Sequence, residues 1–244
     1  VAPYYRYATA DHSNIGRVEL SGNLDHTFGF LFGMSLRDFG DLDAGRDVGR
    51  QPKTGYDEAS WDARIDCYLD QDNRITFAYQ RHRQDDAWRT HKTIHGISWH
   101  GTTIGSEKKR ILDQERDLAY IQYHGRNLGL FCDTATVSFS YHVQSEERFR
   151  VKSNNTSDRQ GFTVRTLGLW AQFTSPTPVG LLTYGAEFYR DNVNSFKRKY
   201  NADGTLKSIE IQGPVADDAI YDLAGLFVQD EFAAHSPGQA LPRE

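Results

Sequence analysis

The feature that most constrains the fold of this chain is a series of nine stretches in which apolar and polar residues alternate. A period of two places successive side chains on opposite faces of a β-strand. In one stretch, for example, Val137, Phe139 and Tyr141 alternate with Ser138 and Ser140. The nine stretches are, to within a residue or two, 17–24, 27–38, 57–69, 75–83, 116–124, 134–147, 161–173, 181–191 and 218–232. The sequence therefore predicts an all-β chain of about nine antiparallel strands.

The connections between these strands alternate between short and long. Short connections lie near Asp25 and at 70–74, 125–133 and 174–180, and long polar connections lie at 39–56, 84–115, 148–160 and 192–217. Several of the strands reach about 11 to 14 residues, and a tilted strand needs about 9 to 11 to cross a membrane. Short turns at one end and long loops at the other are typical of an outer-membrane β-barrel. We therefore expect part of a transmembrane, antiparallel, up-and-down barrel with its long loops outside the cell.

Amphipathic strands also occur in soluble β-sandwiches, so alternation alone leaves that fold open. The order of the loops favours the barrel, because the Greek-key connections of sandwiches mix long and short loops at both ends. In a barrel the apolar face of each strand meets lipid and the polar face lines the lumen. The polar face of the stretch 57–69 carries Asp62, Arg64 and Asp66.

The composition excludes some classes of protein. Hydrophobic residues make up 38% of the chain, and the mean hydropathy is −0.65. No run approaches the roughly 18 apolar residues that a membrane-spanning helix requires, whereas a barrel strand needs lipid-facing residues only at alternate positions. The formal charge of −5 comes with no long basic run, so nucleic acid is not expected as a partner.

No motif in the sequence predicts catalysis or a resident cofactor. The two cysteines, Cys67 and Cys132, have no partners at metal-binding spacing, and we expect two unpaired thiols. No catalytic Ser-His-Asp arrangement or phosphate-binding glycine loop is present, so we expect a protein that is not an enzyme. Because the first residues form no signal peptide and the last ones lie within a connection, residues 1–244 are interpreted as an internal piece of a larger barrel domain.

Four segments resemble TonB-dependent outer-membrane receptors, in particular the branch that handles haem, haemoglobin and transferrin iron. Gly225-Leu-Phe-Val-Gln-Asp-Glu-Phe232 is similar to a barrel-strand motif of these receptors. Thr183-Tyr-Gly-Ala-Glu-Phe-Tyr-Arg-Asp-Asn-Val-Asn-Ser195 resembles a strand-to-loop passage of the same family. The segments 37–57 and 116–146 are similar to further barrel segments.

The resemblance implies a barrel of about 22 strands whose lumen is closed by an N-terminal plug domain. It also implies that the plug, the TonB-contacting segment and the closing C-terminal strands lie outside this sequence. The expected partners are the protein's own plug, the TonB complex, outer-membrane lipid and a small iron chelate or haem. The expected activity is uptake of that iron complex across the outer membrane.

The candidate ligand-binding residues are three histidines of the longest connection, namely His91, His95 and His100. Imidazole ligates iron in many proteins, so an iron or haem receptor has a use for these residues. An ordinary solvated loop remains the alternative. His82 and His142, together with Asp62, Arg64, Asp66, Glu146 and Glu187, are interpreted as lumen groups that bind each other, water or the plug.

Asn201-Ala-Asp-Gly204 predicts a turn that makes a protruding hairpin within the last long connection. Two other functions remain open on the sequence. One is a passive, porin-like channel in the outer membrane, and the other is a secreted β-rich enzyme or carbohydrate-binding domain.

Overall fold

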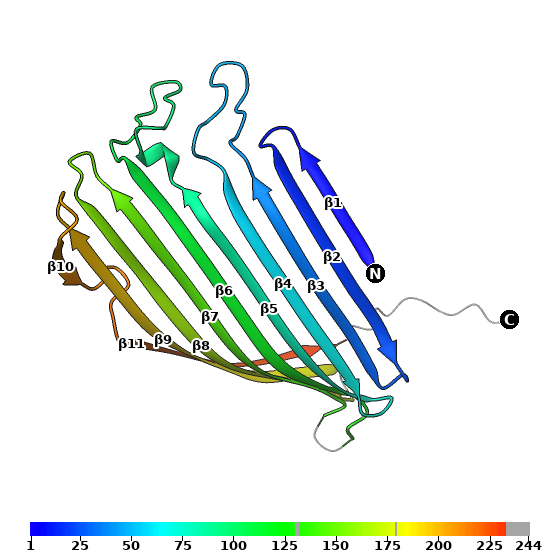
Figure 1. The fold of residues 1–244 in the computed structure, drawn as a ribbon. Coiled ribbons are helices and arrows are strands. Elements are labelled where there is room, and N and C mark those ends of the chain that lie inside the picture. The colour runs from blue at the N-terminus through cyan, green and yellow to red at the C-terminus, as the bar shows by residue number, and fades with distance from the viewer. Residues whose placement is uncertain (130–131, 179, 233–244) are drawn as a thin grey trace, which may run out of the picture.

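The computed structural model describes residues 1–129, 132–178 and 180–232, and it consists almost entirely of one antiparallel β-sheet. Figure 1 shows the strands side by side in a strongly curved sheet. The described residues form eleven strands: β1 (Ala2–Ala8), β2 (Ser13–Leu24), β3 (Phe28–Phe39), β4 (Tyr56–Tyr68), β5 (Asn73–Trp88), β6 (Lys109–Gly125), β7 (Thr134–Val151), β8 (Ser157–Pro176), β9 (Leu181–Tyr200), β10 (Leu206–Glu210) and β11 (Ala219–Glu231). The one helical segment described is a 3₁₀ turn at Thr90–Lys92.

Consecutive strands are neighbours from β1 to β9, which is an up-and-down order. β9 pairs with β8 along its whole length. On its other side it pairs with β10 at Lys197–Tyr200 and with β11 at Leu181–Val193. The sheet is open, since β1 and β11 are not paired with each other. The all-β, antiparallel, up-and-down prediction is confirmed as an open section of sheet. In the described residues no helix is long and apolar enough to cross a membrane.

Six of the predicted strands were too short, and two strands were missed. The strands predicted at 17–24 and 116–124 begin earlier, at Ser13 and Lys109, and that predicted at 161–173 spans Ser157–Pro176. The strands predicted at 75–83, 134–147 and 181–191 continue to Trp88, Val151 and Tyr200. The predicted long connection at 148–160 is wrong, because only 152–156 lies outside the strands there. Most of these extensions carry polar residues on both faces, so hydrophobic alternation could not reveal them. The exception is Arg148-Phe-Arg-Val151, which continues the alternation of β7 and was left out of the predicted strand. The missed strands are β1 and β10, although the turn at 201–204 and the hairpin that contains β10 were predicted.

The sheet has no hydrophobic core. Among the described hydrophobic residues only Ile111, Leu112 and Ala135 are buried. Phe77, Phe139 and Leu169 each leave about half of their surface exposed, at 50%, 49% and 50%. A sandwich would cover such side chains with a second sheet, and here one layer leaves them open.

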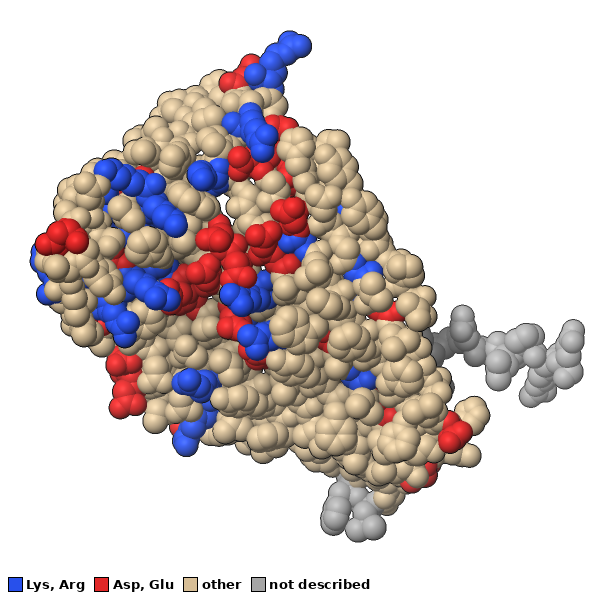
Figure 2. All heavy atoms as spheres, in the orientation of Figure 1, with Lys and Arg blue, Asp and Glu red and all other residues tan. Residues whose placement is uncertain are grey.

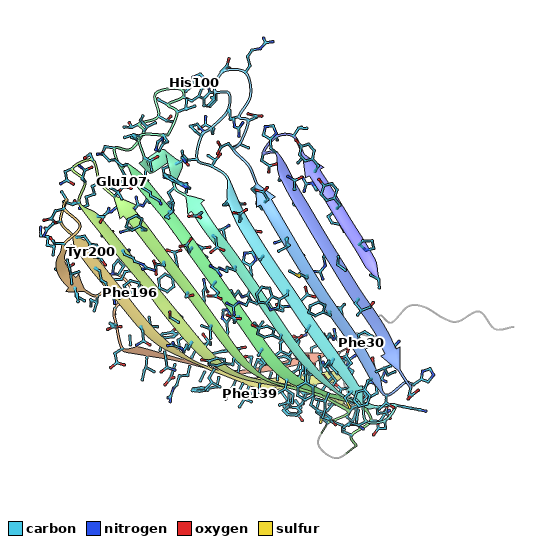
Figure 3. All side chains as sticks on the ribbon, viewed as in Figure 1. Phe30, His100, Glu107, Phe139, Phe196 and Tyr200 are labelled. Atoms are coloured by element: carbon cyan, nitrogen blue, oxygen red, sulfur yellow. The ribbon has the colours of Figure 1, made fainter. Side chains whose placement is uncertain are left out.

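The exposed apolar side chains form a belt on one face, which we call the outer face. Directly paired residues share a face of the sheet. The pairing places Phe30, Ile65, Phe77, Ile121, Phe139, Leu169 and Phe188 in a single row across β3 to β9. In Figure 3, Phe30 and Phe139 lie toward the lower ends of their strands. Figure 2 shows the charged atoms gathered toward the upper part of the visible face, with few below.

The upper edge of the belt moves along the strands from one side of the sheet to the other. On β3 the last apolar residue of the outer face before Asp38 is Leu36, and on β9 it is Phe188, which precedes Arg190. The paired row that starts at Leu36 arrives on β9 at Asn194. The edge therefore shifts from 194 to 188 over six strands, about one residue per strand. With about 3.3 Å along a strand and 4.8 Å between strands, a flat membrane boundary requires a tilt of about 35°, as in membrane barrels.

Candidate functional site

The face opposite the belt, which we call the inner face, carries a network of ion pairs and hydrogen bonds. Arg17 on β2 reaches across β3 and donates two hydrogen bonds to Asp62 on β4, at 2.8 and 3.2 Å. It can cross because β3 has Gly33 there, where a Cβ would collide with the guanidinium. Arg37 pairs with Glu58 at 2.9 Å. These contacts join three strands without any covering layer.

The predicted lumen residues lie on this inner face. Asp66 pairs with Arg64 at 2.9 Å, and Glu146 accepts a hydrogen bond from Gln114 at 2.8 Å. Glu187 lies in the inner-face row of Trp170 and Gly225. Of the two histidines, His82 contacts the Ser60 hydroxyl at 2.8 Å, and His142 Nε2 lies 3.0 Å from Arg116 Nε. The carboxylates are thus distributed over several strands and held mainly by basic or amide partners, which is the arrangement of a polar wall.

A denser cluster lies at the upper end of the inner face, beyond the apolar belt, and we call it the mouth cluster. It consists of Arg110 on β6, Arg148 and Arg150 on β7, Asp158 on β8, and Glu107 just before β6. Asp158 is 2% exposed and accepts hydrogen bonds from Arg148 at 2.7 Å and from Arg150 at 2.8 and 2.5 Å. Glu107 lies 3.3 Å from Arg150 and 3.4 Å from Arg110. Figure 3 marks Glu107 near the upper end of β6.

The charges of the mouth cluster shift the pKa values of its members. Burial alone would raise the pKa of Asp158, but the hydrogen bonds from Arg150 and Arg148 outweigh it, so this pKa lies below its ordinary value. Burial lowers the pKa of Arg110, and the nearby Arg148, Arg150 and Arg89 lower it further, against the opposing effect of Glu107. Arg110 therefore lies where positive charge is crowded.

The local sequence explains why the mouth cluster forms. β7 and β8 are joined by a tight turn in which Lys152 N donates to Thr156 O at 2.9 Å. Asn155 in that turn has a φ of 65°, a left-handed conformation that asparagine tolerates. The turn sets Arg150 opposite Asp158 and Arg148 opposite Gln160. Two adjacent asparagines, Asn154 and Asn155, lie midway between Arg150 and Asp158 and are a sequence signal of this tight turn. The prediction missed the hairpin because it assigned 148–160 to a long loop.

The three candidate histidines occupy separate places in the connection between β5 and β6. His91 lies in the 3₁₀ turn and is exposed. His95 is half-buried and packs edge-on against Trp88, with ring centroids 5.8 Å apart. His100 is exposed, stacks edge-on with Trp99 at 4.0 Å, and projects at the far end of the loop in Figure 3. Over the described residues, no three His, Cys, Asp or Glu side chains are grouped so as to hold a metal ion. The ligand-binding role of these histidines stays a prediction.

The base of this connection is held by buried threonines and by the neighbouring loop. Thr93 is 0% exposed, and its hydroxyl donates to Thr90 O at 2.8 Å. The Thr90 hydroxyl contacts Lys53 O in the connection between β3 and β4. Lys53 lies over the Trp88 ring at 5.2 Å. The two long connections therefore form one packed cap at the upper end of the sheet.

Both cysteines are free thiols, as predicted from the sequence. Cys67 lies on the outer face of β4, paired with Phe28 and Ile75, and Cys132 lies between β6 and β7. Neither is near the mouth cluster in the sheet.

Comparison with known proteins identifies the fold. No protein-family model matches the sequence, and no curated protein sequence matches it. Among solved structures, the chain is similar to the FrpB iron transporter from Neisseria meningitidis. For the F3-3 variant the identity is 15% and the TM-score 0.61, and for the F5-1 variant they are 16% and 0.59. The apoprotein form of the F5-1 variant matches at 13% identity with a TM-score of 0.55.

The alignments cover most of this chain and a minority of the transporter. They include 88% of the present chain and 41% of the chain of the F3-3 and F5-1 variants. All three of these solved structures are of an iron transporter. At this level of identity the comparison concerns the fold. The chain therefore has the fold of a section of the FrpB iron transporter.

Proposed function

We propose that this chain forms part of the barrel wall of a TonB-dependent outer-membrane receptor that takes up an iron complex. The observation that carries the proposal is the division of one curved layer into an apolar outer belt and a hydrogen-bonded polar inner face, in a fold shared with an iron transporter. A belt exposed to this degree is suited to lipid, and an inner face of this kind is suited to a hydrated lumen. The sequence resemblance supports the same family.

In this proposal a plug domain and the TonB complex, neither of which is part of residues 1–244, act together with the barrel wall described here. A plug domain binds the inner face, and TonB acts on the plug to release the cargo inward. Haem and a siderophore-like chelate are the two candidate cargoes, with His91, His95 and His100 as candidate contacts. Residues 1–244 supply a section of the barrel domain, in the outer membrane of a Gram-negative type of cell.

Uptake measurements test this proposal. Cells that carry the full-length gene are expected to accumulate labelled iron from haem or from a siderophore, and deletion of the gene should reduce that uptake to background. Deletion of TonB should have the same effect, because release of the plug requires the proton gradient. Expression should also rise when iron is withheld. Uptake that persists without TonB would instead indicate a passive channel.

The orientation of the sheet gives a separate prediction. In a protein whose Cys67 and Cys132 are replaced by serine, a cysteine at Ala202 in the β9–β10 turn should react with a membrane-impermeant maleimide on intact cells. A cysteine at Gln71, in the exposed turn between β4 and β5, should react only after the outer membrane is opened. Labelling of both sites on intact cells, or of Gln71→Cys alone, would contradict the orientation.

A further inference from the structure

The upper end of the inner face has more positive charge than its own carboxylates neutralise. Arg89 N donates to Arg110 O, so Arg89 extends the paired row that continues through Arg150, Asp158 and Lys199. The next row toward the belt contains Arg148 and Lys197. The six cations of these rows are Arg89, Arg110, Arg148, Arg150, Lys197 and Lys199. The carboxylates among them are Asp158, Glu107 and Glu210, the last of which pairs with Lys199 at 2.7 Å.

Six cations against three carboxylates leave an excess of three positive charges, although the whole chain carries −5. Lower on the same face, Arg17 and Arg37 have close carboxylate partners in Asp62 and Glu58, whereas Arg116 contacts His142. The positive excess therefore lies mainly at the entrance. Local excess charge of this kind attracts ions of opposite sign and is screened by salt.

Two of these cations, Arg110 and Lys197, have hydrogen-bond donors that are not fully used within the described residues. Arg110 Nε is buried and has no hydrogen-bond partner among the described residues, and Nη1 of the same guanidinium lies 3.4 Å from a carboxylate oxygen of Glu107. Lys197 lies opposite Gln160 and Glu210. It takes part in none of the ion pairs found among the described residues. A guanidinium fork binds a carboxylate through two parallel hydrogen bonds, and an ammonium binds one as a point charge. Arg110 and Lys197 lie three strands apart, on β6 and β9, so they suit separate carboxylates of one ligand. The chemistry present is that of a carboxylate site.

The face on which these cations lie restricts the ligand. Their neighbours in sequence, Ile111, Phe149, Arg159 and Arg198, form the row on the opposite, outer face. Phosphates of membrane lipids approach from that outer side, so lipid does not reach the inner row. A molecule that enters the lumen from outside meets it first.

We infer that Arg110 and Lys197, with Arg89 and Arg148 beside them, bind the carboxylate groups of an anionic iron chelate at the entrance of the lumen. This inference rests on the proposed function, since it specifies the charge class of the cargo. A chelate with free carboxylates fits the site, and so does haem through its propionates. A neutral ferric trihydroxamate has no free carboxylate, so these cations should not increase its affinity.

The inference is tested by binding of two iron complexes to the purified full-length protein in detergent. Ferric citrate is the anionic probe, and a ferric trihydroxamate is the neutral one. Arg110→Gln combined with Lys197→Gln should weaken binding of ferric citrate about tenfold and flatten its dependence on salt. Neither residue contacts the buried Asp158, so the sheet is expected to remain intact.

Matched variants separate this effect from a general loss of charge or of folding. Arg198→Gln with Lys207→Gln removes the same charge near the same end of β9 and on β10, with Arg198 in the outer-face row, and should change affinity by less than about twofold. Arg110→Lys with Lys197→Arg keeps the charge and should retain most of the affinity. Equal losses in the two neutralising pairs would overturn the inference, as would failure of ferric citrate to bind a protein that does bind the neutral complex. If cells take up no iron complex of either charge, the proposed function fails as well.

Discussion

Replacement of Ile121 by arginine is expected to destabilise the protein in a bilayer by about 2 to 4 kcal/mol, the cost of a charged side chain near the middle of a lipid-facing belt. Ile121 lies on the outer face between Phe77 and Phe139 and is 38% exposed. Every neighbour in its row is apolar, so an arginine there has no acceptor within the sheet. Unfolding of the full-length protein from lipid vesicles in denaturant measures the effect, and reduced assembly in cells should accompany it.

The neighbouring residue provides the control. Gln122 is on the same strand at the same depth, but its row contains Thr76 and Ser138 on the inner face. Gln122→Arg should cost less than about 1 kcal/mol, because an arginine in the lumen keeps contact with water. If the two arginines destabilise the protein equally, the assignment of outer and inner faces is wrong.

Asp158→Asn should lower the free energy of local unfolding at the upper ends of β7 and β8 by about 3 kcal/mol. The reason is that removing the carboxylate from a buried ion pair leaves the arginines without a compensating charge. Asp158 accepts hydrogen bonds from two arginines and has almost no access to water. Hydrogen exchange of the amides of 148–151 and 157–160 should accelerate accordingly. Glu147→Gln is the control, because it removes the more exposed Glu147–Arg159 pair from the outer face of the same hairpin. It should change the free energy of local unfolding, measured by the same exchange, by less than about 1 kcal/mol.

The same carboxylate predicts how the hairpin responds to acid. The pKa of Asp158 is lower in the folded protein than its ordinary value of about 3.9. Its ion pairs therefore contribute fully above that ordinary value, and the contribution is lost as the pH falls through the lower, folded pKa. Protection of the hairpin amides should stay constant near neutral pH and decline below about pH 4. Asp158→Asn should remove this part of the pH dependence, and an unchanged acid response would contradict the assignment.

The parts of the fold that sequence predicted best are those in which one face of a strand meets an apolar environment. Under the proposed function, Phe139 and Ser140 reveal their faces because lipid and lumen require different residues at adjacent positions. Above the belt that contrast ends, and Asp158, Arg159 and Gln160 show no apolar alternation although they begin β8. The strand persists there because both neighbours pair with it, which is a tertiary effect that a local pattern does not contain.

The residues of the candidate site likewise fall into those that the strand period could predict and those that it could not. The polar wall residues Asp62, Asp66 and His82 were assigned to the inner face because the strand period fixes that face. The mouth cluster was missed because it depends on which strand comes opposite Asp158, and that pairing became evident only with the β7–β8 turn. The positions of His91, His95 and His100 depend on loop packing against Trp88 and on Thr90, which no periodicity encodes.

The length of the strands beyond the belt has a consequence for how a cargo is captured. β7, β8 and β9 contain 18, 20 and 20 residues, about 60 Å or more at 3.3 Å per residue, whereas the hydrocarbon layer is about 30 Å thick. In a barrel wall of the proposed kind, the upper ends of these strands therefore extend beyond the membrane as hydrogen-bonded sheet, even when the strands are tilted. A ligand that binds Arg110 or Lys197 immobilises side chains whose backbone is already ordered, so it forgoes less conformational entropy than it would on a mobile loop. If the proposed function holds, the surrounding loops can vary in sequence while this rigid section of sheet, to which the iron complex first binds, stays unchanged.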